Sequence, residues 1–300
     1  MDYVTLAPGL PPSSRLGFGC GSVMGRVGRD PSRRAIQMAL DRGITHFDVA
    51  RSYGYGEAEA LVGEALAGRR DRVVVAGKFG LGAPRAAGAL RALKPIAQRL
   101  AATVPGARSV LRALVGGASP AADRFSVAAA QASLDQSLAA LQTDYLDILF
   151  LHDCAAADLT DELAEFLDRQ VAAGKIRAYG AATSIDAALP LCGGWGDKLI
   201  YQFANGFFAP NAERLPGAAH RNVAHSPFFG AERLRGRVAP GDVHALMLAC
   251  ALAAKEVGVV LCSMLDAAHL CANLDAVERP RFSADDAAAL LAAATITSAA

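Results

Sequence analysis

The chain has almost no net charge, no closely paired cysteines and no long hydrophobic run. Its 30 basic and 29 acidic residues leave a net charge of +1, so the overall balance points to neither nucleic acid nor an anionic membrane as a partner. None of the six cysteines forms a C-x-x-C pair, which argues against a zinc ribbon or a dithiol redox motif. We expect isolated cysteines to be small buried hydrophobic residues.

Segments that would direct the chain to or across a membrane are also missing from the sequence. Met1 to Gly21 has no basic head followed by an apolar run, so we expect no signal peptide. The longest apolar stretch, Ala245 to Ala254, is shorter than the roughly 20 residues that a spanning helix needs. The sequence therefore predicts a soluble, cytoplasmic protein without a membrane partner.

Short apolar runs alternate along the chain with segments of helical periodicity. The runs are rich in Val, Ile, Leu and Phe without clean alternation, as expected for parallel strands that are buried on both faces. The expected strands are Arg15–Cys20, Thr45–Val49, Arg72–Ala76, Leu146–Leu151, Ile176–Gly180, Leu199–Phe203, Asn222–His225 and Val259–Cys262. Helix starts are indicated at Asp30-Pro31, Ser126, Thr160, Asp242 and Ser283, with ends at Gly43 and Gly174 and near Gly258.

Eight strands, each followed by a helix or a loop, predict an α/β fold of the (β/α)8 TIM barrel type that forms one domain over residues 1–300. The alternative is a doubly wound open sheet. The glycine-rich segment Gly17 to Gly21 invites that alternative, but no G-x-G-x-x-G motif is completed and no acidic residue closes a second strand at the required distance. We therefore favour the barrel.

A long basic insertion, residues 81–124, follows the third expected strand. Between Gly82 and Arg124 it holds one acid, Asp123, and seven bases, which are Arg85, Arg91, Lys94, Arg99, Arg108, Arg112 and Arg124. Because it follows the carboxyl end of a strand, it should lie at the catalytic face of a barrel. We hypothesise that it forms a lid that favours polar or anionic substrates; the alternative is a solvated surface excursion.

Four chemically useful residues lie at or just after expected strand ends: Asp48, Tyr53, Lys78 and His152. The carboxyl ends of barrel strands converge on one mouth, so residues that are far apart in sequence meet there. A tyrosine has an ordinary pKa of about 10, which a neighbouring ammonium lowers. We expect Lys78 to lower the pKa of Tyr53 and Asp48 to hold Lys78.

These residues can together pass a proton to a carbonyl oxygen. A neutral His152 would donate a hydrogen bond to the substrate oxygen and orient it, while Tyr53 would supply the proton. Donors of this kind stabilise the charge that develops on the oxygen as hydride arrives, typically by a few kcal/mol each. In the reverse direction the Tyr53 phenolate would deprotonate an alcohol.

From about Leu16 to Val277 the chain resembles the aldo-keto reductase family. The segments that carry the resemblance are Gly43–Ala50, Tyr53–Glu57, Ser133–Leu134, Leu141–Ile148, Leu151–His152 and Gly174–Gly180. The resemblance implies a β/α barrel with a nicotinamide cofactor bound extended over its mouth. It also implies that Asp48, Tyr53, Lys78 and His152 form the catalytic set.

The resemblance also implies a set of cofactor-binding residues. Ala182 and Thr183 stand where the family usually carries Ser-Asn to bind the carboxamide, so only Thr183 can form a hydrogen bond by its side chain; Gln202 matches the glutamine expected in the sixth strand. His225 takes the place of the aromatic residue that stacks on the nicotinamide, and the Ser226 that follows it matches the family. We include Gly21 among the residues expected to contact the cofactor.

The segment after the last strand departs most from the family. Ser263, Met264 and His269 align with positions where members that prefer NADP carry Lys or Arg, and Asn273 aligns with the asparagine that contacts adenine. A 2′-phosphate would therefore lose charge-assisted hydrogen bonds worth roughly 1.5–3 kcal/mol each. We expect NAD(H) or NADP(H) as cofactor, with a preference for NAD or weak discrimination.

The leading hypothesis is a nicotinamide-dependent reductase of aldehydes or ketones, or a dehydrogenase of the matching alcohols or sugars. One alternative is a regulatory module that binds the cofactor without turnover. Another is a metal-dependent hydrolase, for which His46, Asp48, His152 and Asp153 could supply ligands. That second alternative leaves Tyr53 and Lys78 without a role, so we assign no metal ligand.

Overall fold

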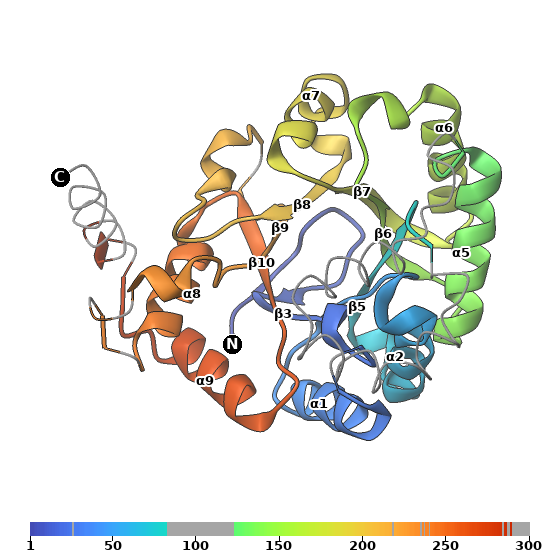
Figure 1. The fold of residues 1–300 in the computed structure, drawn as a ribbon. Helices are drawn as coiled ribbons and strands as arrows, with labels where there is room; N and C mark the ends of the chain where they lie inside the picture. Colours follow the sequence, from blue (N-terminus) through green and yellow to red (C-terminus); the bar gives the residue numbers. More distant parts are fainter. Residues whose placement is uncertain are drawn as a thin grey trace, which may run out of the picture.

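The computed structural model describes residues 1–25, 27–82, 123–217, 219–234, 236, 238–239, 241–283, 285–286 and 289. Eight parallel strands close into a barrel in the order β10-β3-β4-β5-β6-β7-β8-β9 (Figure 1). Their bounds are β3 Leu16–Gly19, β4 His46–Asp48, β5 Val74–Phe79, β6 Leu146–His152, β7 Ile176–Ala182, β8 Ile200–Ala204, β9 Asn222–His225 and β10 Val257–Cys262. The (β/α)8 barrel is confirmed and the open sheet is excluded.

Helices surround the barrel (Figure 1) and cover the apolar outer faces of its strands. In chain order they are α1 Arg29–Asp41, α2 Ala58–Leu66, α5 Val127–Leu141, α6 Asp161–Ala172, α7 Ile185–Trp195, α8 Val243–Ala253 and α9 Ala267–Glu278. The N-caps predicted at Ser126 and Thr160 are confirmed, because their hydroxyls accept hydrogen bonds from the amides of Ala129 and Leu163.

Several sequence-based boundaries differ from the structure, and three of them concern a helix end or a catalytic candidate. Helix α1 begins at Arg29 after Gly28, so Asp30 lies in its first turn, where its charge still favours the positive helix end. Helix α8 ends at Ala253 rather than near Gly258, because Gly258 lies in strand β10, where a side chain would approach the His220 backbone oxygen within 2.3 Å. Strand β5 extends to Phe79, so Lys78 lies inside the strand instead of after it.

Two predicted segments lie largely outside the described residues. Residues 83–122 of the basic insertion are not described, so the lid hypothesis stays a prediction. Of the helix expected to start after Ser283, only residues 285, 286 and 289 are described. The Ser283 hydroxyl accepts a hydrogen bond from the Asp286 amide at 3.1 Å, as expected of a helix cap.

An N-terminal hairpin that the sequence analysis missed closes the end of the barrel opposite the mouth. It pairs β1 (Tyr3–Val4) with β2 (Ser13–Ser14), and its loop places Leu6 and Leu10 in an apolar cluster with inward-facing residues of β5, β6 and β10. The Ser14 amide donates to the hydroxyl of Thr45, just before β4, at 2.9 Å. The hairpin therefore seals the N-terminal ends of the strands.

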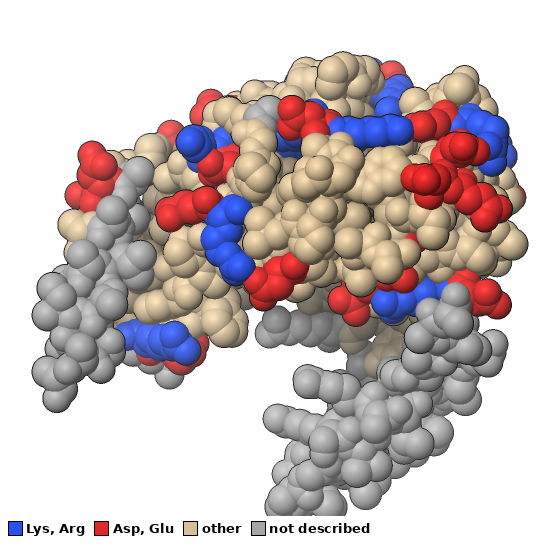
Figure 2. All heavy atoms as spheres, turned by 90° about the horizontal axis from the view of Figure 1, so that it is seen from above, with Lys and Arg blue, Asp and Glu red and all other residues tan. Residues whose placement is uncertain are grey.

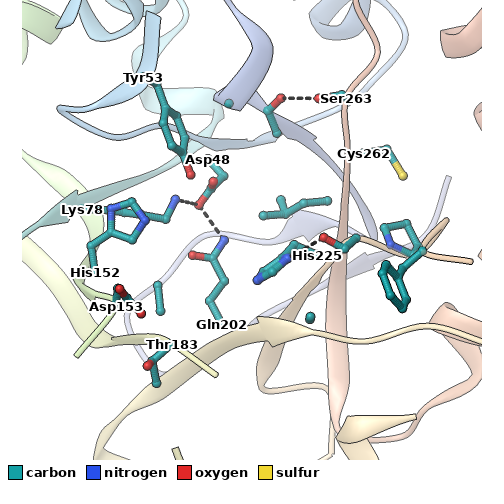
Figure 3. Close-up of a pocket in the computed structure, with 18 of the residues that line it drawn as sticks. Asp48, Tyr53, Lys78, His152, Asp153, Thr183, Gln202, His225, Cys262 and Ser263 are labelled. Atoms are coloured by element: carbon teal, nitrogen blue, oxygen red, sulfur yellow. Dashed lines mark hydrogen bonds and ion pairs between the residues drawn. The ribbon is translucent and has the colours of Figure 1, made fainter. Parts of the chain in front are cut away.

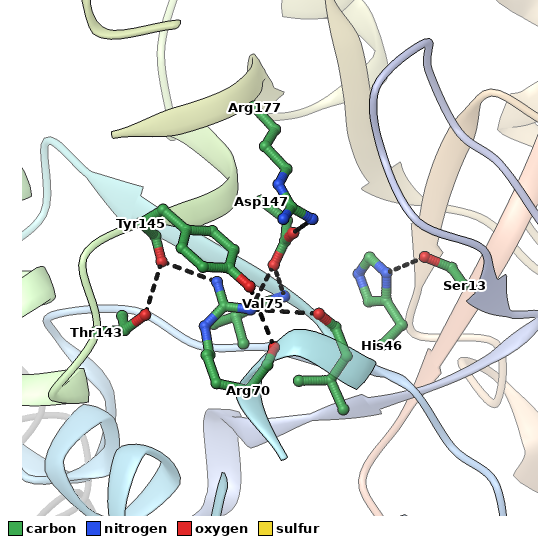
Figure 4. A network of polar contacts seen from close by, with 9 residues as sticks. Ser13, His46, Arg70, Val75, Thr143, Tyr145, Asp147 and Arg177 are labelled. Atoms are coloured by element: carbon green, nitrogen blue, oxygen red, sulfur yellow. Dashed lines mark hydrogen bonds and ion pairs between the residues drawn. The ribbon is translucent and has the colours of Figure 1, made fainter. Parts of the chain in front are cut away.

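A buried carboxylate, Asp147, ties β5, β6 and β7 together near the N-terminal ends of these strands (Figure 4). It accepts a hydrogen bond from the Val75 amide at 2.8 Å and forms ion pairs of 2.8 Å with both Arg70 and Arg177. Both guanidinium groups also lie against the Tyr145 ring, at 4.0 and 4.4 Å from its centroid. Every oxygen of this buried carboxylate is therefore paired.

The face of the molecule shown in Figure 2 carries Lys and Arg side chains interspersed with Asp and Glu side chains. This mixture of signs agrees with the net charge of +1 for the whole chain. Within the part of the chain that the structure describes, no helix is both long enough and apolar enough to span a bilayer.

We predict that Asp147→Asn lowers the free energy of unfolding by roughly 2–4 kcal/mol, because it leaves two partly buried guanidinium groups without their counter-charge. The change is measured as a shift in the urea midpoint at unchanged slope. The matched control is Asp135→Asn, which removes the carboxylate of an exposed 3.5 Å ion pair with Lys175 and should change stability by less than about 1 kcal/mol. Equal effects of the two variants would contradict the structural role assigned to Asp147.

Candidate active site

The structure brings the four predicted catalytic residues to one cavity at the carboxyl ends of the strands (Figure 3). Asp48 ends β4, Lys78 lies in β5 and His152 ends β6, while Tyr53 begins the short 3-10 turn Tyr53–Gly56 after β4. The cavity has a volume of about 950 Å³. The topology of the barrel, not closeness in sequence, assembles these side chains.

A buried ion pair fixes Lys78. Its ammonium contacts Asp48 Oδ1, and the same oxygen accepts a hydrogen bond from the Gln202 side-chain amide at 2.8 Å. Burial acts to lower the pKa of Lys78, but the charges of Asp48 and Tyr53 and hydrogen bonds to both outweigh it and raise the pKa. The ammonium therefore stays charged at neutral pH.

The phenol of Tyr53 lies above this ammonium, with Lys78 Nζ at 5.1 Å from the ring centroid. Burial raises the pKa of Tyr53, while the charge of Lys78 and a hydrogen bond from it act to lower the pKa. Burial is the larger effect, so the net direction is opposite to the lowering that the sequence predicted. The phenol is consequently protonated at neutral pH and is available as an acid.

His152 faces Tyr53 edge-on, with ring centroids 6.2 Å apart and planes at 89°. Burial, aided by the charge of Lys78, lowers the pKa of His152 to about 4, so its imidazole is neutral at pH 7. Its Nδ1 is buried and has no hydrogen-bond partner among the described residues. A neutral imidazole is the form that the sequence-based mechanism required.

The loop that carries Tyr53 is held by a second buried carboxylate, which the sequence analysis missed. Glu59 in α2 pairs with Arg51 at 2.7 Å and accepts a hydrogen bond from the Ser137 hydroxyl of α5 at 2.8 Å. Gly54 has a φ of 58°, and a side chain there would lie 2.7 Å from the Val23 backbone oxygen. The sequence shows no local pattern for this arrangement, because Ser137 lies in another helix, 78 residues along the chain from Glu59.

Six of the residues predicted to bind the cofactor line the same cavity, namely Gly21, Thr183, Gln202, His225, Ser226 and Ser263. Gln202 Oε1 is buried without a partner among the described residues, so it can accept a further hydrogen bond. The Thr183 hydroxyl already donates to the Cys154 backbone oxygen at 2.7 Å. His225 Nδ1 lies 2.9 Å from the Ser226 hydroxyl.

The other predicted cofactor residues lie beyond the cavity. Met264 is fully buried in the main apolar cluster and Asn273 is also buried, whereas His269 is exposed. His269 instead pairs with Asp266, which caps α9: the carboxylate accepts from the His269 amide at 2.8 Å and lies 2.7 Å from its Nδ1. The positive end of α9 is thus covered by a carboxylate of the chain itself.

The ligand set considered for a metal-dependent hydrolase is not assembled. His46 lies one layer below Asp48 in the barrel, where its Nδ1 is 3.2 Å from the Ser13 hydroxyl. Among the described residues, no group of three or more His, Cys, Asp or Glu side chains is placed to hold a metal ion.

We predict that Lys78→Met raises the pKa of Tyr53 above its value in the unsubstituted protein, because the ammonium is the group that stabilises the phenolate. Ionisation of the phenol is followed by its ultraviolet absorbance as pH rises, with Tyr53→Phe subtracted to isolate this residue. The phenol of the variant should begin to ionise at a higher pH. A shift to lower pH would contradict the assignment of Lys78 as its electrostatic partner.

Residues 15–188 match the model of the aldo/keto reductase family. The chain is 30% identical over 188 residues to the aldo-keto reductase YhdN of Bacillus subtilis, covering 61% of this chain and 47% of that protein. It is 30% identical over 166 residues to a 6-dehydroglucose reductase of Novosphingobium aromaticivorans, covering 52% and 43%. The chain thus spans about half the length of these curated relatives.

The fold also matches solved structures of such proteins. The thermostable aldo-keto reductase Tm1743, solved with the inhibitor epalrestat, superimposes with a TM-score of 0.70 at 20% identity, covering 98% of this chain and 100% of that chain. At this identity the match supports the barrel fold alone. The family model covers more than half of the chain, and on that ground the protein belongs to the aldo/keto reductase family.

Proposed function

We propose that the protein is a nicotinamide-dependent oxidoreductase that reduces an aldehyde or a ketone, with Tyr53 as the proton donor. One observation supports this proposal most directly. The protonated phenol of Tyr53, the buried Lys78–Asp48 ion pair and the neutral imidazole of His152 lie together in one cavity. Membership of the aldo/keto reductase family supports the same reaction class. The substrate would be a small carbonyl compound or a sugar derivative.

The residues of the cavity fit a nicotinamide. The orphaned Oε1 of Gln202 suits the amino group of a carboxamide, and the partly buried imidazole of His225 can stack on a flat ring. Ser226 and Ser263 line the same cavity. When bound, the nicotinamide would supply the hydride.

The side chains of the protein would stabilise the charge that develops on the substrate oxygen and would supply the proton. His152 would donate a hydrogen bond to the substrate oxygen and orient it toward Tyr53. As negative charge develops on that oxygen, Tyr53 would give up its phenolic proton, and the ammonium of Lys78 would stabilise the phenolate that remains. Asp48 and Gln202 would keep Lys78 in position throughout. In the reverse direction the same side chains would assist the oxidation of an alcohol. Tyr53 would then act as the base, so its phenol must first lose its proton.

We predict that Tyr53→Phe lowers kcat for carbonyl reduction by about 10²- to 10⁴-fold while leaving cofactor affinity unchanged, because it removes only the acidic hydroxyl. Affinity is measured by quenching of protein fluorescence on titration with the reduced cofactor. The matched control is Tyr145→Phe, whose hydroxyl lies 3.4 Å from the Arg70 backbone oxygen at the opposite end of the barrel. Cofactor binding without any turnover in the unsubstituted protein would instead support a regulatory module.

The carboxylate of Asp266 at the start of α9 bears on the choice between NAD(H) and NADP(H). An exposed 2′-phosphate placed there would meet the Asp266 carboxylate rather than a cation. We propose a preference for NAD(H) or weak discrimination, measured as the ratio of kcat/KM with NADH to that with NADPH.

We predict that Asp266→Asn shifts the NADH to NADPH ratio toward NADPH by about threefold to tenfold, because it removes one repelling charge while asparagine retains the capping function. Asp275→Asn on the exposed side of the same helix should leave the ratio unchanged. A strong NADPH preference of the unsubstituted protein would refute the proposed preference.

A further inference from the structure

The cavity holds one uncompensated charge among the described residues that line it. Asp48 and Lys78 neutralise each other, and burial lowers the pKa of both His152 and His225, so these imidazoles are uncharged at neutral pH. The remaining acidic side chain is that of Asp153, an exposed residue of the cavity wall whose carboxylate forms no ion pair within the described part of the chain. The described residues that line the cavity therefore carry a net negative charge.

The backbone of Asp153 is held firmly at this position. Its φ is 58°, its amide donates to the Ala182 backbone oxygen at 2.7 Å, and its own backbone oxygen accepts from the Arg124 guanidinium at 2.7 Å. Arg124 thus binds the backbone of Asp153 rather than its carboxylate, and it lies over the Phe125 ring at 4.8 Å from the centroid. This guanidinium is not among the groups that line the cavity.

Asp153 lies on the side of the cavity where the substrate would react. Figure 3 shows it beside His152, with Ser263 and Cys262 on the opposite side. Consecutive Cα atoms are about 3.8 Å apart, so the carboxylate is only one residue away from the imidazole that would orient the carbonyl oxygen. The substituents of a bound substrate that extend out of the cavity would lie close to this carboxylate.

We propose that Asp153 is a specificity-determining residue that favours carbonyl substrates carrying an ammonium group and disfavours those carrying a carboxylate. This inference rests on the proposed reductase function. A charge a few ångströms away across a water-accessible mouth changes kcat/KM by about threefold to tenfold. The effect weakens as ionic strength rises, because solvent ions screen exposed charges. The lid hypothesis for the basic insertion predicts the opposite preference.

The test uses three benzaldehydes that differ only in the para substituent, which is a trimethylammonium, a carboxamide or a carboxylate group. For the unsubstituted protein we expect kcat/KM to fall in that order. Asp153→Asn should bring the three values together, and because asparagine also adopts positive φ it retains the backbone conformation. Asp153→Gly, which retains the backbone conformation without any side chain, should behave in the same way.

Asp144→Asn is the matched control, because Asp144 is an exposed residue that precedes the other end of β6, roughly 30 Å away. It should preserve the full charge preference. Unchanged charge ratios in both Asp153 variants, or a preference of the unsubstituted protein for the carboxylate, would overturn the role of Asp153 while the reductase function stands. Absence of turnover with all three aldehydes would overturn the reductase function, and this inference with it.

Discussion

The candidate active site depends on the buried ion pair between Lys78 and Asp48. Strands β4 and β5 are adjacent, with Asp48 opposite Ala76, so their register brings the two side chains together at the carboxyl end of the barrel. Gln202 reaches the same carboxylate from β8, on the opposite side of the barrel. A lysine buried here without this partner would lose its charge, and the phenol above it would lose its electrostatic support.

Removal of water sets the protonation states of the groups around that ion pair. It lowers the pKa of His152 to about 4, which makes the imidazole neutral at pH 7, and it raises the pKa of Tyr53, whose phenol is protonated at that pH even at its ordinary pKa of about 10. These are the forms needed to donate a proton and a hydrogen bond to a carbonyl oxygen. Burial therefore keeps the imidazole of His152 uncharged beside a phenol that retains its proton.

The two ends of the barrel have different roles: one stabilises the fold and the other forms the cavity. At the N-terminal end the hairpin and the Asp147 network hold the strands together, whereas the carboxyl end presents the cavity. Loops and helix starts at the mouth can consequently vary in charge without disturbing the strand pairing below. Asp153 after β6 and Asp266 before α9 are two such positions, and we propose that each carboxylate acts on the charge of a bound ligand.

The sequence alone determined the barrel, the caps of α5 and α6, and the convergence of the catalytic candidates, because strand runs, caps and the order of elements are encoded within a few neighbouring residues. The tertiary structure decided which way the pKa of Tyr53 moves and how the loop that carries it is held. Burial competes there with the ammonium of Lys78, and the Glu59 carboxylate finds Ser137 on another helix. Such effects arise only between residues distant in sequence, and a local pattern does not reveal which of them wins.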